Sequence, residues 1–372
     1  MSGLGFSTEP DMQPRSCLQG HQSGLRPPTM NKNAEPSRIV IAGGGGFIGK
    51  HLTEHLIDAG WSVAILSRGH VPTHHAVEAE WVHWDGHTLG EWAAHLDGAA
   101  GLINLAGRNV NCRYNASNRR AILQSRLDSV RVLDEAVRQC QVPPAVWVQA
   151  STLAIHGDRG DAWLDEASPP GDESDFSPGI GRAWEAAFAS AHAGGARKVL
   201  LRMSFVLGTD GGALPFLARL SRSGLGGRIG SGRQYYSWVH VEDVSRVVEW
   251  ALSRTRLSGL FNVTSPNPVR NAAFMAELRR AVRRPPSPPV PVWAIRLGCL
   301  LMRTEPELAL RSRRGLPRRL EQAGFRFKYP ELGPALEALL VRKPANRAAA
   351  VSTAAHLPRR APVRGLTHLW KL

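Results

Sequence analysis

The stretch RIVIAGGGGFIG, residues 38–49, decides the fold class of this 372-residue chain. Its first five residues form an apolar run typical of a buried strand, and apolar residues at helical spacing follow from Phe47 to Ala59. Glycines let the backbone turn tightly and approach a pyrophosphate, which the free N–H groups at the start of the helix then bind. The alternative is a glycine-rich turn without a ligand. We predict a dinucleotide-binding turn with contacts from Gly43, Gly46, Phe47, Ile48 and Gly49.

Short apolar runs alternate with amphipathic segments beyond this turn. Continuous apolar strands between such helices are typical of a parallel sheet that is covered on both faces. The predicted strands are 38–42, 62–66, 80–84, 101–105, 145–150, 198–203 and 260–263. The predicted helices are 47–59, 115–139, 182–193, 241–252, 272–282 and 292–302, with a helix–turn–helix over 316–340. The pattern predicts an α/β fold, a doubly wound parallel sheet (Rossmann), with a smaller C-terminal α-rich substrate or cap region.

The pattern changes near both ends of the chain and at one internal junction. Residues before Ser37 show no hydrophobic period, and the proline cluster 285–291 marks a junction. Met1 and Met30 both fit as the first residue, because the first strand begins after either. The predicted parts are a disordered N-terminal extension (1–36), an NAD(P)-binding Rossmann domain (37–270, with substrate-side elements from about 204), a short C-terminal domain (285–335) and a basic disordered tail (341–372).

The net charge of +15 comes from the C-terminal part of the chain. Residues 278–328 carry 13 basic and three acidic side chains, and residues 341–372 carry seven basic and no acidic ones. Proteins that bind nucleic acid show such basic segments, but they interleave them with aromatic side chains on which bases stack. That interleaving is missing, so we expect a small-molecule substrate and no nucleic acid. The sequence carries no signal for an oligomeric state.

Cysteine usage and hydropathy indicate where the protein works. Four cysteines are widely spaced and form no CxxC pair, which is typical of a reducing compartment. No apolar run approaches the ~20 residues of a membrane span, and the N-terminal 36 residues lack the apolar segment of a secretory signal. The histidines show no metal-ligand spacing. We therefore expect a cytoplasmic protein without a membrane span and without a metal site.

The residues that end the predicted strands favour one dinucleotide over another. An acidic residue after the second strand would bind the adenosine ribose, but Ser67 and Arg68 stand there. Arg68 can pair with a 2′-phosphate, and Ser67 can donate to it, so we predict NADP rather than NAD. The alternative for Arg68 is an ordinary solvated side chain. Further predicted cofactor contacts lie at the ends of the third and fourth strands: Asp85, Leu105, Ala106 and Gly107.

The end of the fifth predicted strand carries a hydroxyl pair in a recognisable context. Residues 150–157 read ASTLAIHG, which resembles the Ser-Ser/Thr-x-x-x-Tyr-Gly pattern of the extended short-chain dehydrogenases/reductases. In that family the hydroxyl polarises the carbonyl of the substrate, which the resemblance assigns to Ser151 and Thr152. Further matching segments are LSR (66–68), INLAG (103–107), QSR (124–126), LRMSFVLGTDGGAL (201–214), GLGGRIGSGRQYYSWVHVEDV (224–244) and LPRRLEQAGFRFKYPEL (316–332).

The chain departs from the family at its usual catalytic pair, Tyr-x-x-x-Lys. Counted back from Glu185, Ser177 stands in the place of the tyrosine and Gly181 in that of the lysine. The chain thus resembles an atypical, nucleotide-sugar-epimerase-like subgroup that lacks the pair and carries a short C-terminal domain of unknown function. This resemblance implies that Arg126 and Glu185 lie in or beside the cofactor cleft. Their alternatives are an exposed helix arginine and a surface carboxylate.

A glycine-rich, aromatic loop over residues 224–240 is too long for a simple connection inside a compact domain. We predict that Arg233, Tyr235 and His240 line a substrate pocket, as the matching stretch does in extended reductases. For His240 the alternative is a buried structural histidine.

Two functions follow from these patterns. The first is an NADP-binding oxidoreductase or epimerase-like enzyme of the extended reductase type, in which Ser151 or Thr152 polarises a carbonyl. The second is a catalytically silent NADP-binding protein that senses redox state or regulates a partner. The missing tyrosine and lysine favour the second function, and the pocket loop favours the first.

Overall fold

The computed structural model describes residues 37–69, 78–301 and 305–341. The predictions for the N-terminal extension (1–36) and for the tail beyond Val341 concern residues outside these ranges. Within the described ranges, no helix is both long enough and apolar enough to cross a membrane.

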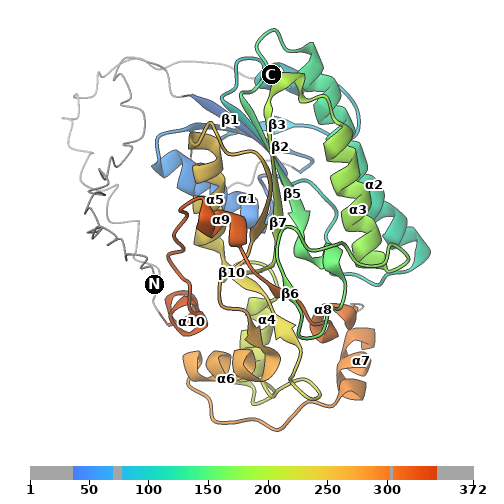
Figure 1. The fold of residues 1–372 in the computed structure, drawn as a ribbon, viewed down its shortest axis with the longest axis vertical. Helices are drawn as coiled ribbons and strands as arrows, with labels where there is room; N and C mark the ends of the chain where they lie inside the picture. The colour runs from blue at the N-terminus through green and yellow to red at the C-terminus, as the bar shows by residue number, and fades with distance from the viewer. Residues whose placement is uncertain (1–36, 70–77, 302–304, 342–372) are drawn as a thin grey trace, which may run out of the picture. The chain divides into compact units, whose positions relative to one another are not determined.

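A seven-stranded parallel sheet forms the centre of the fold (Figure 1). Its strand order is β11-β7-β5-β4-β1-β2-β3. The strands are β1 (Arg38–Ala42), β2 (Ser62–Ser67), β3 (Glu80–His83), β4 (Gly101–Asn104), β5 (Val146–Thr152), β7 (Arg197–Met203) and β11 (Gly259–Val263). The order reverses direction at β1, so β1 and β4 diverge at the switch point where such sheets bind ligands. The predicted doubly wound parallel sheet is confirmed.

Helices cover both faces of this sheet (Figure 1). Helices α1 (Phe47–Asp58) and α5 (Val241–Ser253) pack together on one face, and α2 (Ala116–Gln139) and α3 (Phe176–Ser190) pack together on the other. The central strands are buried almost completely, whereas the edge strand β3 is partly exposed, and one continuous apolar core extends across the sheet. Burial on both faces explains why the strands read as apolar runs without alternation.

Helix α3 begins six residues before the predicted start at Arg182, and this is a correction. Pro178 and two glycines suggested a loop, but Pro178 lies in the first turn, where its missing N–H has no helical partner to lose. Gly181 packs directly against Ile155, so its lack of a side chain is required by contact rather than by a bend.

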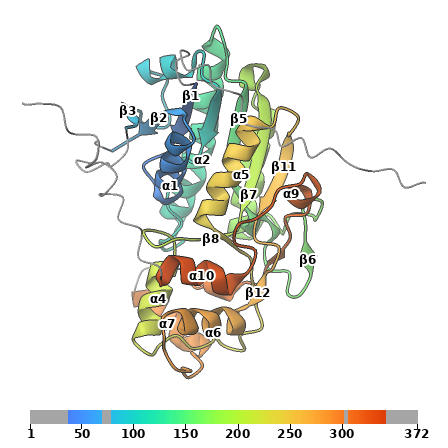
Figure 2. The ribbon, with the colours of Figure 1, turned by 90° about the vertical axis from the view of Figure 1, so that its left-hand side faces the viewer.

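Short elements, most of them after β7, build a second layer below the carboxyl ends of the main strands. Three two-stranded pairs form here: β8 (Phe205–Leu207) with β10 (Trp238–His240), β9 (Tyr235–Tyr236) with β12 (Val269–Arg270), and β6 (Trp163–Leu164) with β13 (Arg314–Gly315). Helices α4 (Leu214–Arg222), α6 (Asn271–Ala281) and α10 (Leu332–Leu340) enclose a smaller core (Figure 2). The remaining helices are η1 (Glu91–Leu96), η2 (Leu153–His156), η3 (Ala193–Gly195), α7 (Val292–Leu301), α8 (Glu307–Leu310) and α9 (Arg318–Gln322).

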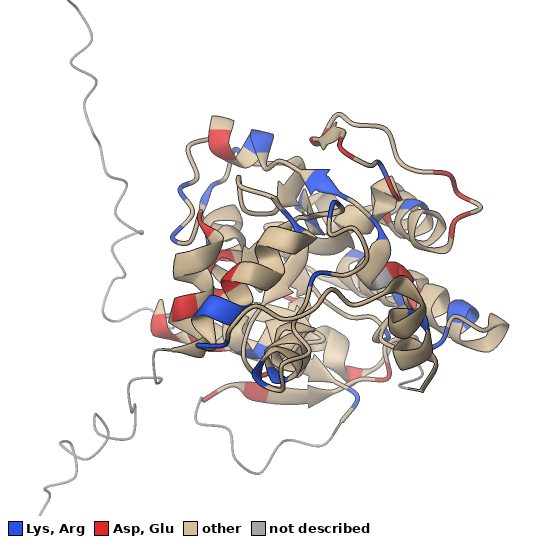
Figure 3. Ribbon diagram, turned by 90° about the horizontal axis from the view of Figure 1, so that it is seen from below, with Lys and Arg blue, Asp and Glu red and all other residues tan. Residues whose placement is uncertain are grey.

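Charged residues of the described chain are intermingled on the side seen from below. In that view, Lys and Arg residues lie on several elements with Asp and Glu residues between them (Figure 3). Helix α7 carries the largest apolar exposure, with Trp293 68% and Leu301 76% exposed.

Candidate functional site

The turn between β1 and α1 requires glycine at specific positions. Gly43 has φ of +79°, and a Cβ on it would lie 2.9 Å from the backbone nitrogen of Ala106. A Cβ on Gly49 would collide with the backbone of Gly44. Gly46 precedes α1 and offers no side-chain cap, so the first N–H groups of the helix are not satisfied by a cap. The turn therefore forms an open cradle of backbone donors.

The side chains of Phe47 and Ile48 face the protein rather than this cradle. The Phe47 ring fills the space over the loop after β8, where a Cβ on Gly208 or Gly211 would collide with it. Ile48 packs against the main core. Any contact of these two residues with a phosphate must therefore come from their backbone N–H groups.

The end of β2 presents an arginine whose side chain has no partner among the residues that the structure describes. Arg68 is exposed, and among the described residues its guanidinium makes no hydrogen bond or ion pair. The Ser67 hydroxyl accepts from the N–H of Gly69 at 3.2 Å and keeps its hydrogen for another acceptor. Ser67 also lies beside Gly45, since a Cβ on that glycine would be 3.5 Å from the Ser67 oxygen. Ser67, one of the two residues predicted to favour NADP over NAD, therefore lies next to the glycine turn.

Asp85 is engaged in its own loop. Its Oδ1 accepts from the N–H groups of His87 and Thr88, both at 2.8 Å, and Oδ2 accepts from the Thr88 hydroxyl. These hydrogen bonds, opposed by a burial cost, lower the pKa of Asp85 well below its usual range. The carboxylate stabilises the loop after β3, and most of its acceptor capacity is used there.

The end of β4 brings the next predicted contacts to the glycine turn. The N–H of Leu105 donates to Ala42 at 2.9 Å, and Ala106 lies against Gly43. Gly107 lies against Arg126, whose guanidinium carbon would be 3.2 Å from a Cβ on Gly107. Three groups of residues that are distant in sequence therefore meet at the β1–β4 switch point.

Arg126 is held in a fixed orientation from α2. Its Nη1 donates to the carbonyl oxygens of Ile122 (2.9 Å) and Arg108 (3.1 Å), and its guanidinium stacks on the Trp184 ring at 4.9 Å. Burial lowers the pKa of Arg126 to about 10, so the side chain remains a cation at neutral pH. Since Nη1 alone makes these bonds, the other donors of the fork remain available to an anion or a ribose hydroxyl.

Ser151 belongs to a buried polar network. Its Oγ donates to Oε1 of Glu185 at 2.6 Å, and Arg202 binds both oxygens of Glu185 at 2.8 and 2.7 Å. Arg202 also lies 3.5 Å from Nε2 of His156, whose Nδ1 bonds the carbonyl of Pro169. Burial lowers the pKa of His156, and the neighbouring Arg202 adds to this effect. Glu185 thus connects α3 to β5 and β7, and both of its carboxylate oxygens are hydrogen-bonded within the protein.

Thr152 differs from its neighbour. Its Oγ1 accepts from the N–H of Ala154 at 3.1 Å, which caps η2 and leaves the hydroxyl hydrogen free. Thr152 is partly exposed, whereas Ser151 is buried. Of the two predicted hydroxyls, Thr152 is the one with a proton to donate.

The three predicted substrate residues do not meet. Arg233 is exposed and lines a cavity, whereas the Tyr235 ring is stacked between the guanidinium groups of Arg270 and Arg314. His240 is buried, accepts from the N–H of Glu242 at 3.1 Å and stacks on Tyr329 at 4.0 Å.

His240 therefore has the surroundings of a structural residue. Its Nε2 is buried without a partner among the described residues. Burial lowers the pKa of His240 to about 4, so the ring is neutral at physiological pH. It starts α5 as an N-cap, which matches the alternative of a buried structural histidine.

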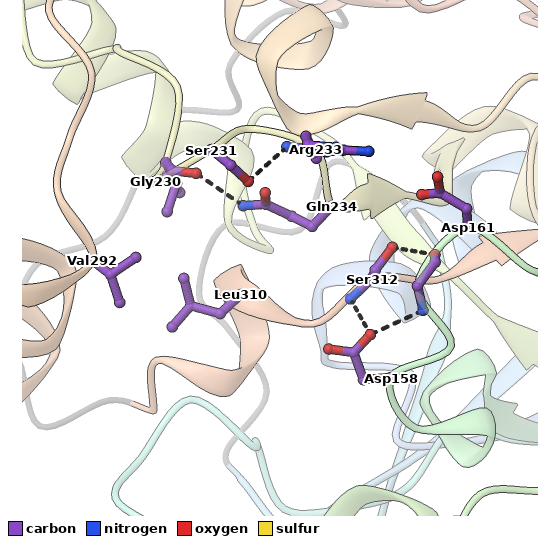
Figure 4. Close-up of a pocket in the computed structure, with 11 residues that line it drawn as sticks. Asp158, Asp161, Gly230, Ser231, Arg233, Gln234, Val292, Leu310 and Ser312 are labelled. Carbon is purple, nitrogen blue, oxygen red and sulfur yellow. Dashed lines mark hydrogen bonds between the residues drawn. The ribbon is translucent and has the colours of Figure 1, made fainter.

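A cavity of about 300 Å³ lies below the strand ends (Figure 4). Val292 and Leu310 form an apolar side, and Asp158, Asp161 and Ser312 lie on the opposite, polar side. Its remaining lining residues are Gly160, Ile229, Gly230, Ser231, Arg233 and Gln234. Residues of the Rossmann part (158–234) and residues of the C-terminal region (292–312) both line this cavity. No local sequence pattern indicated that these two parts of the chain meet here.

Sequence reasoning also missed the partner of Ser177. The Oγ of Ser177 donates to Oε1 of Glu307 at 2.9 Å, a carboxylate that the sequence around Ser177 did not indicate. The two residues are 130 positions apart, and no motif connects them. Arg202, on the strand next to β5, was missed for the same reason.

Known proteins match this arrangement of turn, strand ends and C-terminal region. The NAD dependent epimerase/dehydratase family matches residues 39–264, more than half of the chain. The chain belongs to this family. A domain of unknown function, DUF1731, matches residues 290–339. The resemblance to an epimerase-like subgroup with such a C-terminal domain is confirmed.

Individual members of the epimerase/dehydratase family match over most of their length. The epimerase family protein SDR39U1 of Bos taurus is 33% identical over 307 residues, which cover 82% of this chain and 99% of that protein. Epimerase family protein YfhF of Bacillus subtilis is 34% identical over 306 residues, covering 81% and 97%. The crystal structure of human SDR39U1 with NADPH has a TM-score of 0.73 and 32% identity, and covers 82% of this chain and all of that one.

Proposed function

We propose that this chain is an NADP-dependent oxidoreductase or epimerase-like enzyme that acts on a small molecule. The observation that carries the proposal is the glycine cradle at the switch point, which the backbone of Ala106 closes so tightly that a Cβ on Gly43 would clash. A similar family member was crystallised with NADPH, which supports a dinucleotide in this cradle.

The residues around the cradle fit such a dinucleotide. The N–H groups from Phe47 to Gly49 would bind the pyrophosphate, and Ala106 and Gly107 would lie under the adjoining ribose. Arg126 would meet a ribose hydroxyl or a phosphate oxygen with its free donors. The bound nicotinamide would supply hydride transfer, and this chain's residues would orient the substrate and handle the proton.

Arg68 supports the preference for NADP. Arg68 has no partner among the described residues, and the guanidinium could pair with a 2′-phosphate, whereas NAD offers only a ribose hydroxyl there. Arg68→Ala should weaken NADPH binding by about 1–3 kcal/mol and leave NADH binding nearly unchanged. Titration by tryptophan fluorescence measures both, with Arg222→Ala, an exposed arginine on α4, as the matched control. Equal affinity of the wild type for NADPH and NADH would contradict the preference.

Thr152 supports carbonyl chemistry at the end of β5. Its free hydroxyl hydrogen can donate to a carbonyl oxygen, and the strand holds it in place. The cavity lined by Arg233, Asp158 and Leu310 offers polar and apolar walls for the remainder of a substrate. We assign the substrate to this cavity and to the region between it and Thr152.

A second function is favoured by one specific observation. Gly181, where the family has lysine, lies against Ile155 with no room for a side chain. A silent NADP-binding sensor or regulator would need neither group of the missing pair. The two functions separate in a turnover screen of the purified protein with NADP⁺ or NADPH against secondary alcohols, carbonyl compounds and UDP-sugars. Tight NADPH binding without turnover would favour the sensor.

A further inference from the structure

The first turns of α3 lack both groups that extended reductases use for proton transfer. Ser177 and Gly181 occupy the two positions. A Cβ on Gly181 would lie 2.9 Å from the Cβ of Ile155, so lysine has no space there. If the proposed function is correct, the proton must move through another part of the chain.

A carboxylate from the C-terminal region reaches this part of α3. Glu307 opens α8, and its Oε1 accepts from the Ser177 hydroxyl at 2.9 Å. The same carboxylate pairs with Nε of Arg311 at 3.2 Å. A serine extended by a hydrogen-bonded carboxylate reaches much farther from the helix than serine alone. Glu307 therefore places a carboxylate next to position 177, where the family has its tyrosine.

Three further contacts fix α8 in this place. Nη1 of Arg311 donates to Oδ2 of Asp175 at 2.5 Å, at the residue that precedes α3. Oε1 of Glu305 accepts from the N–H of Tyr114 at 2.6 Å, just before α2. Nη2 of Arg113 donates to the carbonyl of Leu300 at 3.1 Å. The C-terminal region is thus bound to the starts of both helices on this face.

The other groups around Glu307 keep or donate their protons. Burial raises the pKa of Tyr114 well above its usual range, and the charge of Glu307 adds to the shift, so the phenol keeps its proton. Burial lowers the pKa of Arg313, an effect that Glu307 opposes, and Arg311 has a raised pKa through Asp175 and Glu307. Both arginines remain cations, and Ser177 donates. The carboxylate is the remaining group with free lone pairs.

Glu307 belongs to a helix that contributes a wall to the cavity. Its side chain is 17% exposed, and Leu310, one turn later on α8, lines the cavity wall. Ser312, two residues farther along, lies on the polar side of the same cavity. A substrate in the cavity therefore approaches the element that carries the carboxylate.

We propose that Glu307 is the catalytic base that replaces the missing tyrosine, so that the C-terminal domain completes the active site; this inference rests on the proposed function. A secondary alcohol gives its O–H proton to the Glu307 carboxylate, directly or through the Ser177 hydroxyl. The electron pair of the O–H bond forms the C=O bond, and the carbon loses its hydride to the oxidised nicotinamide dinucleotide. Glu307 then releases its proton to water. Carbonyl reduction follows the same steps in reverse.

The test compares Glu307→Gln with Glu305→Gln in the full-length protein. Glutamine at 307 can still accept the Ser177 hydrogen bond but cannot take a proton. We expect kcat for alcohol oxidation to fall about 10²-fold or more, with KM and the NADPH dissociation constant within about threefold of wild type. Glu305→Gln keeps a carbonyl oxygen for the Tyr114 N–H and should leave kcat within about threefold.

Two readouts separate a base from a structural contact. In the wild type, oxidation should slow at low pH as the carboxylate is protonated, and this acidic limb should be absent in Glu307→Gln. Added formate should restore activity to Glu307→Ala, because the small carboxylate can enter the space left by the side chain. A packing role would show neither effect.

The possible negative results distinguish a wrong assignment of the base from a wrong proposed function. If the wild type turns over an alcohol, a carbonyl compound or a UDP-sugar and Glu307→Gln stays within about threefold, Glu307 is not the base and the proposed function stands. If Glu307→Gln loses NADPH binding, the carboxylate is structural and this inference is wrong. If the wild type binds NADPH but turns over none of these probes, the enzymatic function fails together with the base.

Discussion

The Ser151 hydroxyl donates its hydrogen to Glu185, 2.6 Å away, while Arg202 holds both oxygens of that carboxylate. A serine has one hydrogen, so Ser151 has none left for a substrate carbonyl. Thr152, the next residue, accepts from Ala154 and keeps its hydrogen. Two adjacent hydroxyls that are equivalent in the sequence therefore have different hydrogen-bonding capacities.

This difference leads to a prediction about the two hydroxyls. Thr152→Val should lower kcat for carbonyl reduction about 10²-fold, as when a donor to the developing oxyanion is removed. Ser151→Ala should lower kcat less, because its hydrogen is already used by Glu185. Steady-state kinetics on any substrate found in the screen measures both variants, with NADPH binding as the check on folding. A larger loss for Ser151→Ala would reverse the assignment.

The buried pair of Arg202 and Glu185 should matter for stability. The two side chains are only 6% and 14% exposed, so Arg202→Met leaves a buried carboxylate without its cation. We expect a loss of about 3–5 kcal/mol in the free energy of unfolding, measured by urea denaturation. The control is Arg280→Met, which breaks the exposed pair with Glu277 and should cost at most about 1 kcal/mol. Similar losses for the two variants would contradict the desolvation argument.

Substitution of Gly43 should impair NADPH binding for a reason beyond the positive backbone angle of this residue. Gly43→Ala adds both the strain of a positive φ and a clash with Ala106, and it should abolish NADPH binding. Gly98→Ala is the matched control, since Gly98 has φ of +72° but nothing within 4 Å of a Cβ. The control should destabilise the protein by about 1 kcal/mol and bind NADPH normally. Retained binding in Gly43→Ala would show that the cradle lies elsewhere.

His240 should make stability depend on pH. Its pKa is lowered by burial from 6.5 to about 4, so the unfolded chain binds a proton more readily than the folded protein between these values. This contribution to stability is complete above pH 6.5 and is lost as the pH falls toward 4.

His240→Asn keeps an acceptor for the Glu242 N–H and removes the titrating group. Between pH 7.5 and 5, the wild type should lose about 2 kcal/mol more unfolding free energy than this variant. Urea denaturation at the two pH values measures the difference. Because the pKa of His156 is also lowered, both proteins should retain some pH dependence, and only the difference between them reports on His240. Equal pH dependence would contradict the assignment.

The sequence predicted the parts of the fold that depend on local patterns. Strands buried on both faces read as apolar runs, and the glycine turn identified β1 and α1 directly. The start of α3 was misplaced because Pro178 and Gly181 are local signals for a loop, and tertiary packing outweighs them here. The two- and three-residue strands, such as β9 and β12, are too short to show a period. They exist because segments that are distant in the sequence pair with each other, as the long loop does with Val269 and Arg270.

The candidate site was predictable only in part. A predicted strand end or a sequence motif marks the positions of Gly43, Ala106 and Arg126. The structure brings these three residues together. Glu307 and Arg202 carry no such mark, since each meets its partner through long-range packing. Asp85 and His240 are the opposite case. Their residue types suggest a role in binding or catalysis, but their hydrogen bonds stabilise a loop and cap a helix.

The contact between Gly181 and Ile155 also has an evolutionary consequence. Any side chain at position 181 would meet the Cβ of Ile155, so lysine there requires glycine at position 155 or a shift of α3. Glycine at 155, however, leaves a void under α3 while glycine is still present at 181. Each change is unfavourable without the other, so no single substitution can place lysine at position 181 while α3 keeps its present packing.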